Sequence, residues 1–331
     1  MTMRRFSILI TVLCAMTATL RGETQGTICF NEVMVSNLDQ FVDPSWNYGS
    51  WVEMYNSTEG DIQLRGYWLS DDPTIPRKAR IAQSTIVPRG GHKVLWMGHH
   101  DRYCLSQVNL KLEPNGGSLF LSNVAGVIVA QMDYPPIPPR ASYARTTDGA
   151  EEWSLSSTPT PGATNAGMTF CTERLDAPVV TRESQIFSGS IAFSVGIPAG
   201  CTLRYTTDGS TPTMSEGSTS TNGYFSVSHT TVYRFALFRK GYLSSPVVTR
   251  SFIYNDKDFT LPVISVVTAP RNLYSDTLGI FVQGTKGRPG LGQSSKCNWN
   301  MDWDRPCNFE LLDAEGRSLV NQEGEMNRCG G

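Results

Sequence analysis

The sequence predicts an all-β protein built from β-sandwiches in tandem, and three observations support this prediction. Apolar and polar residues alternate with a period of two, as in residues 203–207 and 232–239. Turn signals recur at short spacing, at residues 115–117, 148–149, 208–209 and 222–223. No long amphipathic helix is visible. Short, evenly spaced strands joined by such turns are typical of sandwiches.

Composition bounds the class of protein. The chain has 331 residues, a length that predicts two or three domains. The formal net charge is −2, so the chain has no global positive field to attract nucleic acid or anionic lipid. Only 18% of the residues are charged, while Gly (30) and Pro (19) are plentiful, as in many β-rich extracellular proteins.

The N-terminus has the pattern of a secretory signal peptide over residues 1–22. Arg4 and Arg5 precede an uncharged, mostly apolar run at 6–20, which Arg21 closes. The alternative, a transmembrane helix, needs about 20 apolar residues, and this run is shorter. We therefore expect a secreted, periplasmic or cell-surface protein with no membrane span once the signal is removed.

Cysteine usage agrees with export but defines no metal site. Outside the predicted signal the chain has seven cysteines: Cys29, Cys104, Cys171, Cys201, Cys297, Cys307 and Cys329. Disulfides are permitted outside the cytoplasm, and the odd number leaves at least one thiol without a partner in the chain. No Cys-x-x-Cys pair occurs, and no histidine lies near a cysteine at ligand spacing, so we do not expect a zinc site.

Two breaks divide the chain into three blocks. Residues 158–167 are rich in Pro, Gly and Thr, and residues 255–258 form a short polar break after a strand. The resulting blocks cover about 24–168, 174–255 and 258–331. The first two are long enough to bury cores of their own, whereas the third is too short to do so alone.

The first block resembles the lamin-tail domain at several motifs that occur in the family's order. These motifs are residues 28–34, 51–56, 64–72, 116–122 and 159–165. The resemblance covers nearly all of the block. It implies an immunoglobulin-like sandwich with a tethering or recognition role and no catalytic function.

The second block resembles the chitobiase/hexosaminidase C-terminal type of domain. The resemblance rests on the string at 203–213, which holds an Asp-Gly turn and a Pro exit, and on residues 230–234 and 241–250. It covers the whole block. It implies a small fibronectin-III-like sandwich that acts as a spacer or accessory module of carbohydrate-active and surface proteins.

The third block resembles the truncated, β-rich start of the α+β kinase-like family of spore-coat protein H (CotH). The resemblance rests on residues 261–268, 298–306 and 309–316, whereas Asn327 and Arg328 depart from the family's pattern. The nucleotide-contacting lysine and metal-binding acids of that family would lie downstream. No catalytic, cofactor-binding or metal-binding residue is therefore expected here. Binding of ATP and a divalent metal is expected only if the missing kinase-like part is present.

Four residues are candidates for facing a ligand. Asp71 and Asp72 could act as acids or cation ligands, but aspartates before a proline are also typical of a turn. Tyr224 and Tyr242 could stack on a sugar. Tyr205 and Tyr233 alternate with arginines, so we expect these two to face a core instead.

Three further groups of polar residues are also open to a purely structural interpretation. Glu53 is a further candidate acid, with the capping of a turn as the alternative. The alternating polar residues of 298–304 suggest a calcium loop, but Trp303 and Phe309 occupy the positions where an EF-hand needs Gly and Glu. We expect an amphipathic strand there, with Trp299, Met301 and Trp303 inward. His92 is expected in a loop.

Taken together, the sequence predicts a secreted or surface protein whose function is non-catalytic binding, tethering or presentation. An extracellular protein or a glycan is the expected partner. Two alternatives stay open: a fragment of a secreted kinase-like phosphotransferase, from the third block, and an accessory arm of a carbohydrate-active enzyme, from the second.

Overall fold

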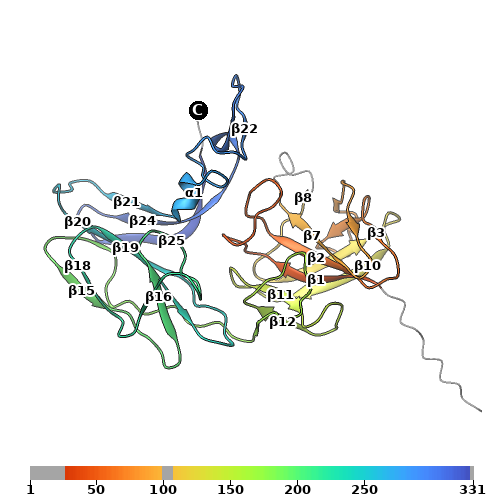
Figure 1. The fold of residues 1–331 in the computed structure, drawn as a ribbon, viewed down its shortest axis with the longest axis horizontal. Helices are drawn as coiled ribbons and strands as arrows, with labels where there is room; N and C mark the ends of the chain where they lie inside the picture. Colours follow the sequence, from red (N-terminus) through yellow and green to blue (C-terminus); the bar gives the residue numbers. More distant parts are fainter. Residues whose placement is uncertain (1–26, 99–106, 329–331) are drawn as a thin grey trace, which may run out of the picture.

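The computed structural model describes residues 27–98 and 107–328, and most of the regular structure in these ranges is β-strand (Figure 1). The arrangement confirms the predicted all-β fold of tandem sandwiches. The predicted signal peptide, at 1–22, lies outside the described residues. Within the described ranges, no helix has the length and apolar character that crossing a membrane requires.

The first sandwich contains strands β1 to β13. One sheet has seven strands in the order β13 (Phe170–Cys171), β12 (Trp153–Ser156), β11 (Ser142–Arg145), β1 (Ile28–Met34), β2 (Trp51–Asn56), β7 (His92–Met97) and β8 (Gln107–Val108). The facing sheet has the order β10 (Ile128–Tyr134), β9 (Gly117–Ser122), β4 (Trp68–Ser70) and β5 (Ala79–Arg80). A separate pair is formed by β3 (Ile62–Gln63) and β6 (Ile86–Val87).

The two sheets of the first sandwich enclose one hydrophobic core. Phe30 and Val52 from the seven-stranded sheet pack with Leu119 and Leu121 from the four-stranded sheet, and all four are buried. Strand β1 is also buried on its outer side, because residues 158–167 lie over it. The Pro- and Gly-rich segment that we predicted as a linker is therefore part of the first sandwich, and β13 continues the sheet beyond it.

The second sandwich contains strands β14 to β20. Its larger sheet has the order β14 (Gln185–Phe187), β20 (Val248–Tyr254), β19 (Thr231–Phe238), β16 (Thr202–Thr206) and β17 (Ser218–Ser220). The smaller sheet pairs β15 (Ile191–Ser194) with β18 (Tyr224–Val227). The core between them is aromatic: the rings of Tyr205 and Tyr233 pack against Phe225 and Phe235, which confirms that both tyrosines face inward.

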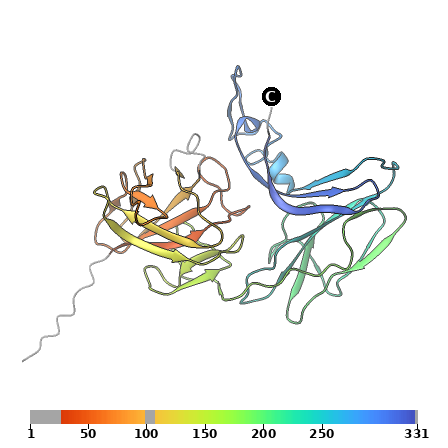
Figure 2. The same cartoon turned by 180° about the vertical axis from the view of Figure 1, so that it is seen from behind.

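The third segment, residues 258–328, lies on the second sandwich (Figure 2). Its main sheet has the order β21 (Val263–Val267), β24 (Arg305–Leu312) and β25 (Ser318–Met326). Its other elements are α1 (Pro270–Tyr274), η1 (Asn298–Asn300), β22 (Arg288–Pro289) and β23 (Lys296–Cys297).

Polar contacts fix the third segment to the larger sheet of the second sandwich. The hydroxyls of Ser251 and Ser265 lie 2.9 Å apart, and Asn321 Nδ2 donates to Thr249 O at 3.0 Å. These two contacts are made by β20, and Arg234 of β19 reaches Glu323 of β25 at 3.3 Å. This contact explains why Arg234, which alternates with the core tyrosines, is also buried.

Residues 298–304 do not form the amphipathic strand that alternation predicts. Residues Asn298–Asn300 form a 3₁₀ helix, and Asn298 points inward, where its Nδ2 donates to Asp276 O and Gly279 O at 3.0 and 3.2 Å. A buried amide that satisfies two carbonyls of a neighbouring loop outweighs the local alternation. Trp303 is buried as expected, at 2% exposure.

The third segment also contacts the first sandwich. Trp303 Nε1 donates to Ser45 O at 2.7 Å, and Arg305 Nη2 donates to Trp46 O at 3.0 Å. The guanidinium of Arg305 lies between the rings of Tyr48 and Trp303, with its carbon 5.4 and 4.6 Å from the two ring centres. The third segment thus bridges the two sandwiches, and a cavity lies where the three parts meet.

Candidate functional site

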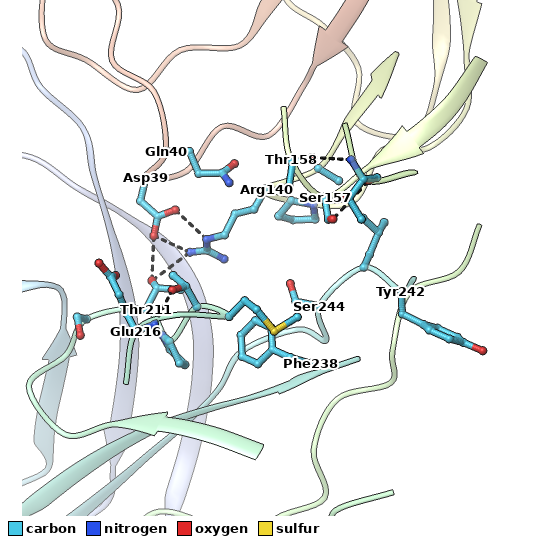
Figure 3. A pocket seen from close by; sticks show the side chains of 18 of the residues that line it. Asp39, Gln40, Arg140, Ser157, Thr158, Thr211, Glu216, Phe238, Tyr242 and Ser244 are labelled. Atoms are coloured by element: carbon cyan, nitrogen blue, oxygen red, sulfur yellow. Dashed lines mark hydrogen bonds and ion pairs between the residues drawn. The ribbon is translucent and has the colours of Figure 1, made fainter. Parts of the chain in front are cut away.

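The cavity has a volume of about 1070 Å³ and is lined by residues from both sandwiches and from the third segment (Figure 3). Loops dominate the lining. Of the lining residues, only Phe238 belongs to a strand, as the last residue of β19, and Pro270 and Arg271 begin α1. The volume is at the upper end of the range of pockets that hold small ligands, about 300–1,000 Å³.

An ion pair with a hydroxyl holds one wall of the cavity. Arg140 donates through Nε to Asp39 Oδ1 at 2.8 Å and through Nη2 to Asp39 Oδ2 at 3.2 Å. Thr211, from the second sandwich, donates to Asp39 Oδ2 at 2.9 Å. Burial raises the pKa of Asp39, but the charge of Arg140 and these hydrogen bonds outweigh it and leave the pKa below its usual value.

A second arginine extends this network into the third segment. Arg234, on β19, donates through Nη1 to Thr211 Oγ1 at 3.0 Å and through Nη2 to Glu323 Oε1 at 3.3 Å. The Asp208–Gly209 turn brings the second sandwich into contact with the same region. Gly209 has φ +86°, and a Cβ at this position would lie 2.4 Å from Thr268 O. All three parts of the chain therefore meet at one polar network.

The backbone is strained at two of these contacts. Arg140 has φ +65° and Trp46 has φ +67°, in the left-handed region that non-glycine residues rarely occupy. Arg140 forms the ion pair with Asp39, and the Trp46 carbonyl accepts from Arg305. Such strain costs about 1–3 kcal/mol per residue and is found mainly where function requires a particular geometry. Both strained residues lie at contacts between parts of the chain.

The cavity is positively charged. Five basic and three acidic side chains line it, a formal balance of +2. The basic residues are Arg140, Arg174, Arg239, Lys240 and Arg271, and the acidic residues are Asp39, Asp208 and Glu216. Among the described residues, Arg140 is the only one of the five bases with a carboxylate at ion-pair distance.

Arg174 is one of the bases without a carboxylate at ion-pair distance among the described residues. Its Nε donates to Ser244 O at 3.1 Å, which fixes the guanidinium against the loop that follows β19. Burial lowers the pKa of Arg174, and the nearby positive charge of Arg140 lowers it further. The charge of Glu323, which pairs with Arg234, offsets part of this effect. Among the described residues Arg174 itself has no carboxylate at ion-pair distance, an arrangement that favours an anion.

One of the four ligand-facing candidates lines the cavity. Tyr242 lies at the end of the cavity away from Asp39, and the guanidinium carbon of Arg239 is 4.6 Å from the centre of its ring (Figure 3). Tyr224, on β18, is 59% exposed and does not line the cavity. The predicted role of either tyrosine in stacking on a sugar stays a prediction.

The two aspartate candidates lie in a turn of the first sandwich, outside the cavity lining. Asp72 Oδ1 accepts from the backbone N and the hydroxyl of Thr74, at 2.8 and 2.7 Å, which is the local pattern of an Asx turn. Asp71 pairs with Lys78 at 2.5 Å. Their contacts follow the turn interpretation, and a role in binding stays a prediction.

A buried acidic cluster lies elsewhere in the first sandwich. Glu32 and Glu53 stand opposite each other in register on β1 and β2, and both are fully buried. Glu53 accepts from Gly162 N at 2.6 Å, and Glu32 accepts from Thr160 N at 3.2 Å. The pair thus anchors residues 158–167. Glu53 does hold a turn, but it does so from the middle of β2, on the outer face of the seven-stranded sheet.

Burial changes the ionisation of this pair. It raises the pKa of Glu32 to about 7 and that of Glu53 to about 8, and hydrogen bonds offset only part of the effect. Asp148 lies beside the pair and accepts from Asn31 Nδ2 at 3.0 Å. His92, expected in a loop, is the first residue of β7, and its Nε2 is 3.1 Å from Asp148 Oδ1. This cluster supports the sheet rather than a cavity.

Other chemistry is sparse in the part of the chain that the structure describes. Within it, no group of three or more His, Cys, Asp or Glu side chains could hold a metal ion. Five described cysteines are free thiols: Cys29, Cys171, Cys201, Cys297 and Cys307. Cys104 and Cys329, and the adjacent histidines at 99–100, lie outside the described residues.

Sequence reasoning missed most of the cavity. Asp39, Arg140 and Arg174 lie in loops without any distinctive local pattern. Thr211 lies in the 203–213 string that identified the second block, so a signal existed there, but it pointed to a turn. Only the spatial convergence of three parts of the chain defines the site.

The fold and the cavity define the class: a tandem β-sandwich protein with a positively charged cavity at the junction of its parts. Two families are found within the chain. Residues 22–136 match the Lamin Tail Domain, and residues 183–249 match the Chitobiase/beta-hexosaminidase C-terminal domain. The chain therefore carries one domain of each family, which confirms the first two sequence resemblances.

Curated proteins and solved structures provide no further support for a function. No match is found among curated proteins. Among solved structures, a biofilm associated protein (BSP domain) aligns with 93% of this chain and 67% of its own, at 9% identity. The TM-score is 0.18, which is too low to support any inference about shared architecture or function.

Proposed function

We propose that this protein is secreted or displayed on the cell surface and that it binds and presents a ligand without transforming it. The observation that carries the proposal is the junction cavity, in which a fixed polar network joins Asp39, Arg140 and Thr211. Beside it lie bases that have no carboxylate at ion-pair distance within the described ranges. Pre-organised loops on rigid sandwiches are a common basis for binding. The signal-like pattern at 1–22 supports the extracellular location.

A cavity-filling variant tests this proposal. Met214 lines the cavity and is 55% exposed, while Val127 is 59% exposed and lies outside the lining. The probes are immobilised glycans and peptides. We expect at least one of these two classes to retain both the unchanged protein and the control Val127→Trp, and not to retain Met214→Trp. Thermal unfolding confirms that both variants fold. Equal retention of Met214→Trp would contradict a binding role for the cavity.

We also propose, as in the sequence analysis, that residues 258–331 begin a CotH kinase-like domain. An uncovered sheet face supports this proposal. Ile264 and Val266 on β21 are 60% and 50% exposed, beside the half-buried Phe309 and Leu311 of β24. Apolar sheet faces are normally covered. Sequencing the gene beyond the last codon is the test, and unrelated sequence there would contradict this second proposal.

A further inference from the structure

The lining of the junction cavity indicates the chemical class of its ligand, provided that the proposed binding function holds. We propose that its ligand is an acidic oligosaccharide, whose carboxylate or sulfate groups are held by Arg174 and Lys240. Three features of the cavity carry this proposal: its uncompensated positive charge, its neutral hydroxyl groups and the loop character of its walls.

The charge sets the sign of the ligand. Arg174, Arg239, Lys240 and Arg271 line the cavity without a carboxylate at ion-pair distance among the described residues. Two acids of the network already have partners: Asp39 binds Arg140 and Thr211, and Glu323, whose charge also acts on Arg174, pairs with Arg234. The guanidinium of Arg174 uses Nε to bind Ser244 O, which leaves its two terminal amino groups for a ligand. A planar guanidinium with two such groups matches a carboxylate or sulfate.

The neutral lining favours a carbohydrate. Hydroxyl groups of Ser157, Thr158, Thr213 and Ser244 line the same cavity and can exchange hydrogen bonds with sugar hydroxyls. Tyr242 adds an aromatic edge, because Arg239 lies over one face of its ring at 4.6 Å. The lining of this cavity of about 1070 Å³ thus includes charged, hydroxyl and apolar groups.

The walls argue against an extended acidic peptide. Peptides commonly bind by adding a strand to an exposed sheet edge, where main-chain groups are free. Of the lining residues, Phe238 alone belongs to a strand, and it lies in β19, which has a neighbour on each side. The cavity therefore offers side chains and loops, and no strand edge for a peptide backbone.

The experiment compares matched probes on the full chain by calorimetry. The probes are a galacturonate tetramer, its fully methyl-esterified form, a chondroitin sulfate tetramer and a hexaglutamate peptide. The ester keeps the rings and linkages and removes only the charge. We expect at least one of the two acidic saccharides to bind, the ester to bind at least tenfold more weakly than the acid, and affinity to fall as salt concentration rises.

Two double variants locate the site. Arg174→Gln with Lys240→Gln should weaken acidic-saccharide binding at least tenfold. The control, Lys111→Gln with Arg317→Gln, removes two exposed bases outside the cavity lining and should leave it unchanged. Lys240 is exposed, and the substitution of Arg174 removes one hydrogen bond to a carbonyl, so the first variant should fold. Thermal unfolding checks this.

Several outcomes would overturn the inference. Equal binding of ester and acid would make charge irrelevant, and tighter binding of hexaglutamate would assign an acidic peptide instead. Failure of both acidic saccharides to bind, or full binding by the Arg174/Lys240 variant, would also reject it. The proposed binding function itself survives these results wherever another ligand class is still lost in Met214→Trp.

Discussion

At the scale of single residues, Glu32 and Glu53 are two buried carboxyl groups that reduce stability when ionised but hold a backbone segment in place. Charged forms are disfavoured in an apolar interior, so each carboxyl holds its proton to a higher pH than it would in water. Both side chains nevertheless bind backbone N–H groups of residues 158–167. They fix this segment over the outer face of the first sandwich, just before β13.

This pair predicts a pH-dependent stability. Because the folded pKa values, about 7 and about 8, lie above the usual value of 4.5, the folded state binds more protons than the unfolded state between these limits. Stability should therefore be greatest near pH 5 and fall as the pH rises to 8. The slope should reach about 1.4 kcal/mol per pH unit for each group. Urea unfolding at pH 5, 6.5 and 8 measures it.

The matched variants are Glu53→Gln and Glu59→Gln. The first removes a buried titrating group while keeping one acceptor oxygen, so its stability should depend less on pH than that of the wild type. The second removes an exposed carboxylate, 85% accessible, and should leave the slope unchanged. An identical slope in wild type and Glu53→Gln would rule out this origin. The lowered pKa of Asp148 acts only at more acidic pH, where its contribution to stability is lost as the pH falls.

At the scale of elements, one tight turn couples the second sandwich to the third segment. The Asp208–Gly209 turn uses a positive φ, which glycine adopts without steric cost. It also places backbone against Thr268, which precedes α1, with no room for a side chain. The turn therefore has two independent reasons to require glycine, and only the first can be read from the sequence.

Replacing Gly209 separates these two reasons. Gly189→Ala is a matched control, because Gly189 has φ +74° and nothing within 4 Å of an added Cβ. We expect Gly189→Ala to lose about 1–2 kcal/mol from backbone conformation alone. Gly209→Ala should lose more, by at least about 1 kcal/mol, because its Cβ must displace Thr268. Urea unfolding measures both, and equal losses would show that the close approach has no energetic weight.

At the scale of the whole molecule, the third segment determines how the two sandwiches are held. It contacts β19 of the second sandwich through Glu323 on one side, and on the other Arg305 contacts the 46–48 loop of the first sandwich. Arg305 is fully buried, and burial lowers its pKa to about 10. Among the described residues no carboxylate lies at ion-pair distance from this buried cation. Carbonyls and aromatic rings hold it instead, so these contacts must be kept for the arrangement to persist.

Arg305→Ala should therefore loosen the junction. It removes hydrogen bonds to Leu278 O and Trp46 O and leaves both carbonyls without this partner, which we expect to cost about 3 kcal/mol. Hydrogen exchange should accelerate in residues 43–48 and 305–312, the two sides of the contact. Arg317→Ala, at a side chain that is 73% exposed, should leave the exchange rates of both regions unchanged, because exposed ion pairs contribute little to stability. Unchanged exchange in Arg305→Ala would contradict the bridging role.

The β architecture, the two sandwiches and the two family resemblances are all predictable from local sequence. Strand periodicity, turns such as Asp208–Gly209 and the inward direction of Tyr205 and Tyr233 are local properties, because each depends on a few consecutive residues. Local pattern failed at 298–304, where the buried amide of Asn298 binds the carbonyls of residues 276 and 279.

Which residues line the junction cavity depends on the tertiary structure. Asp39 and Arg140 are 101 residues apart, and Asp39 and Thr211 are 172 apart. The chain has 28 basic and 30 acidic residues, so composition alone cannot say which of them pair. The packing of the third segment against both sandwiches selects these partners and leaves Arg174 and Lys240 beside a cavity. Charge at that cavity is therefore a property of how the parts meet, because no single segment contains it.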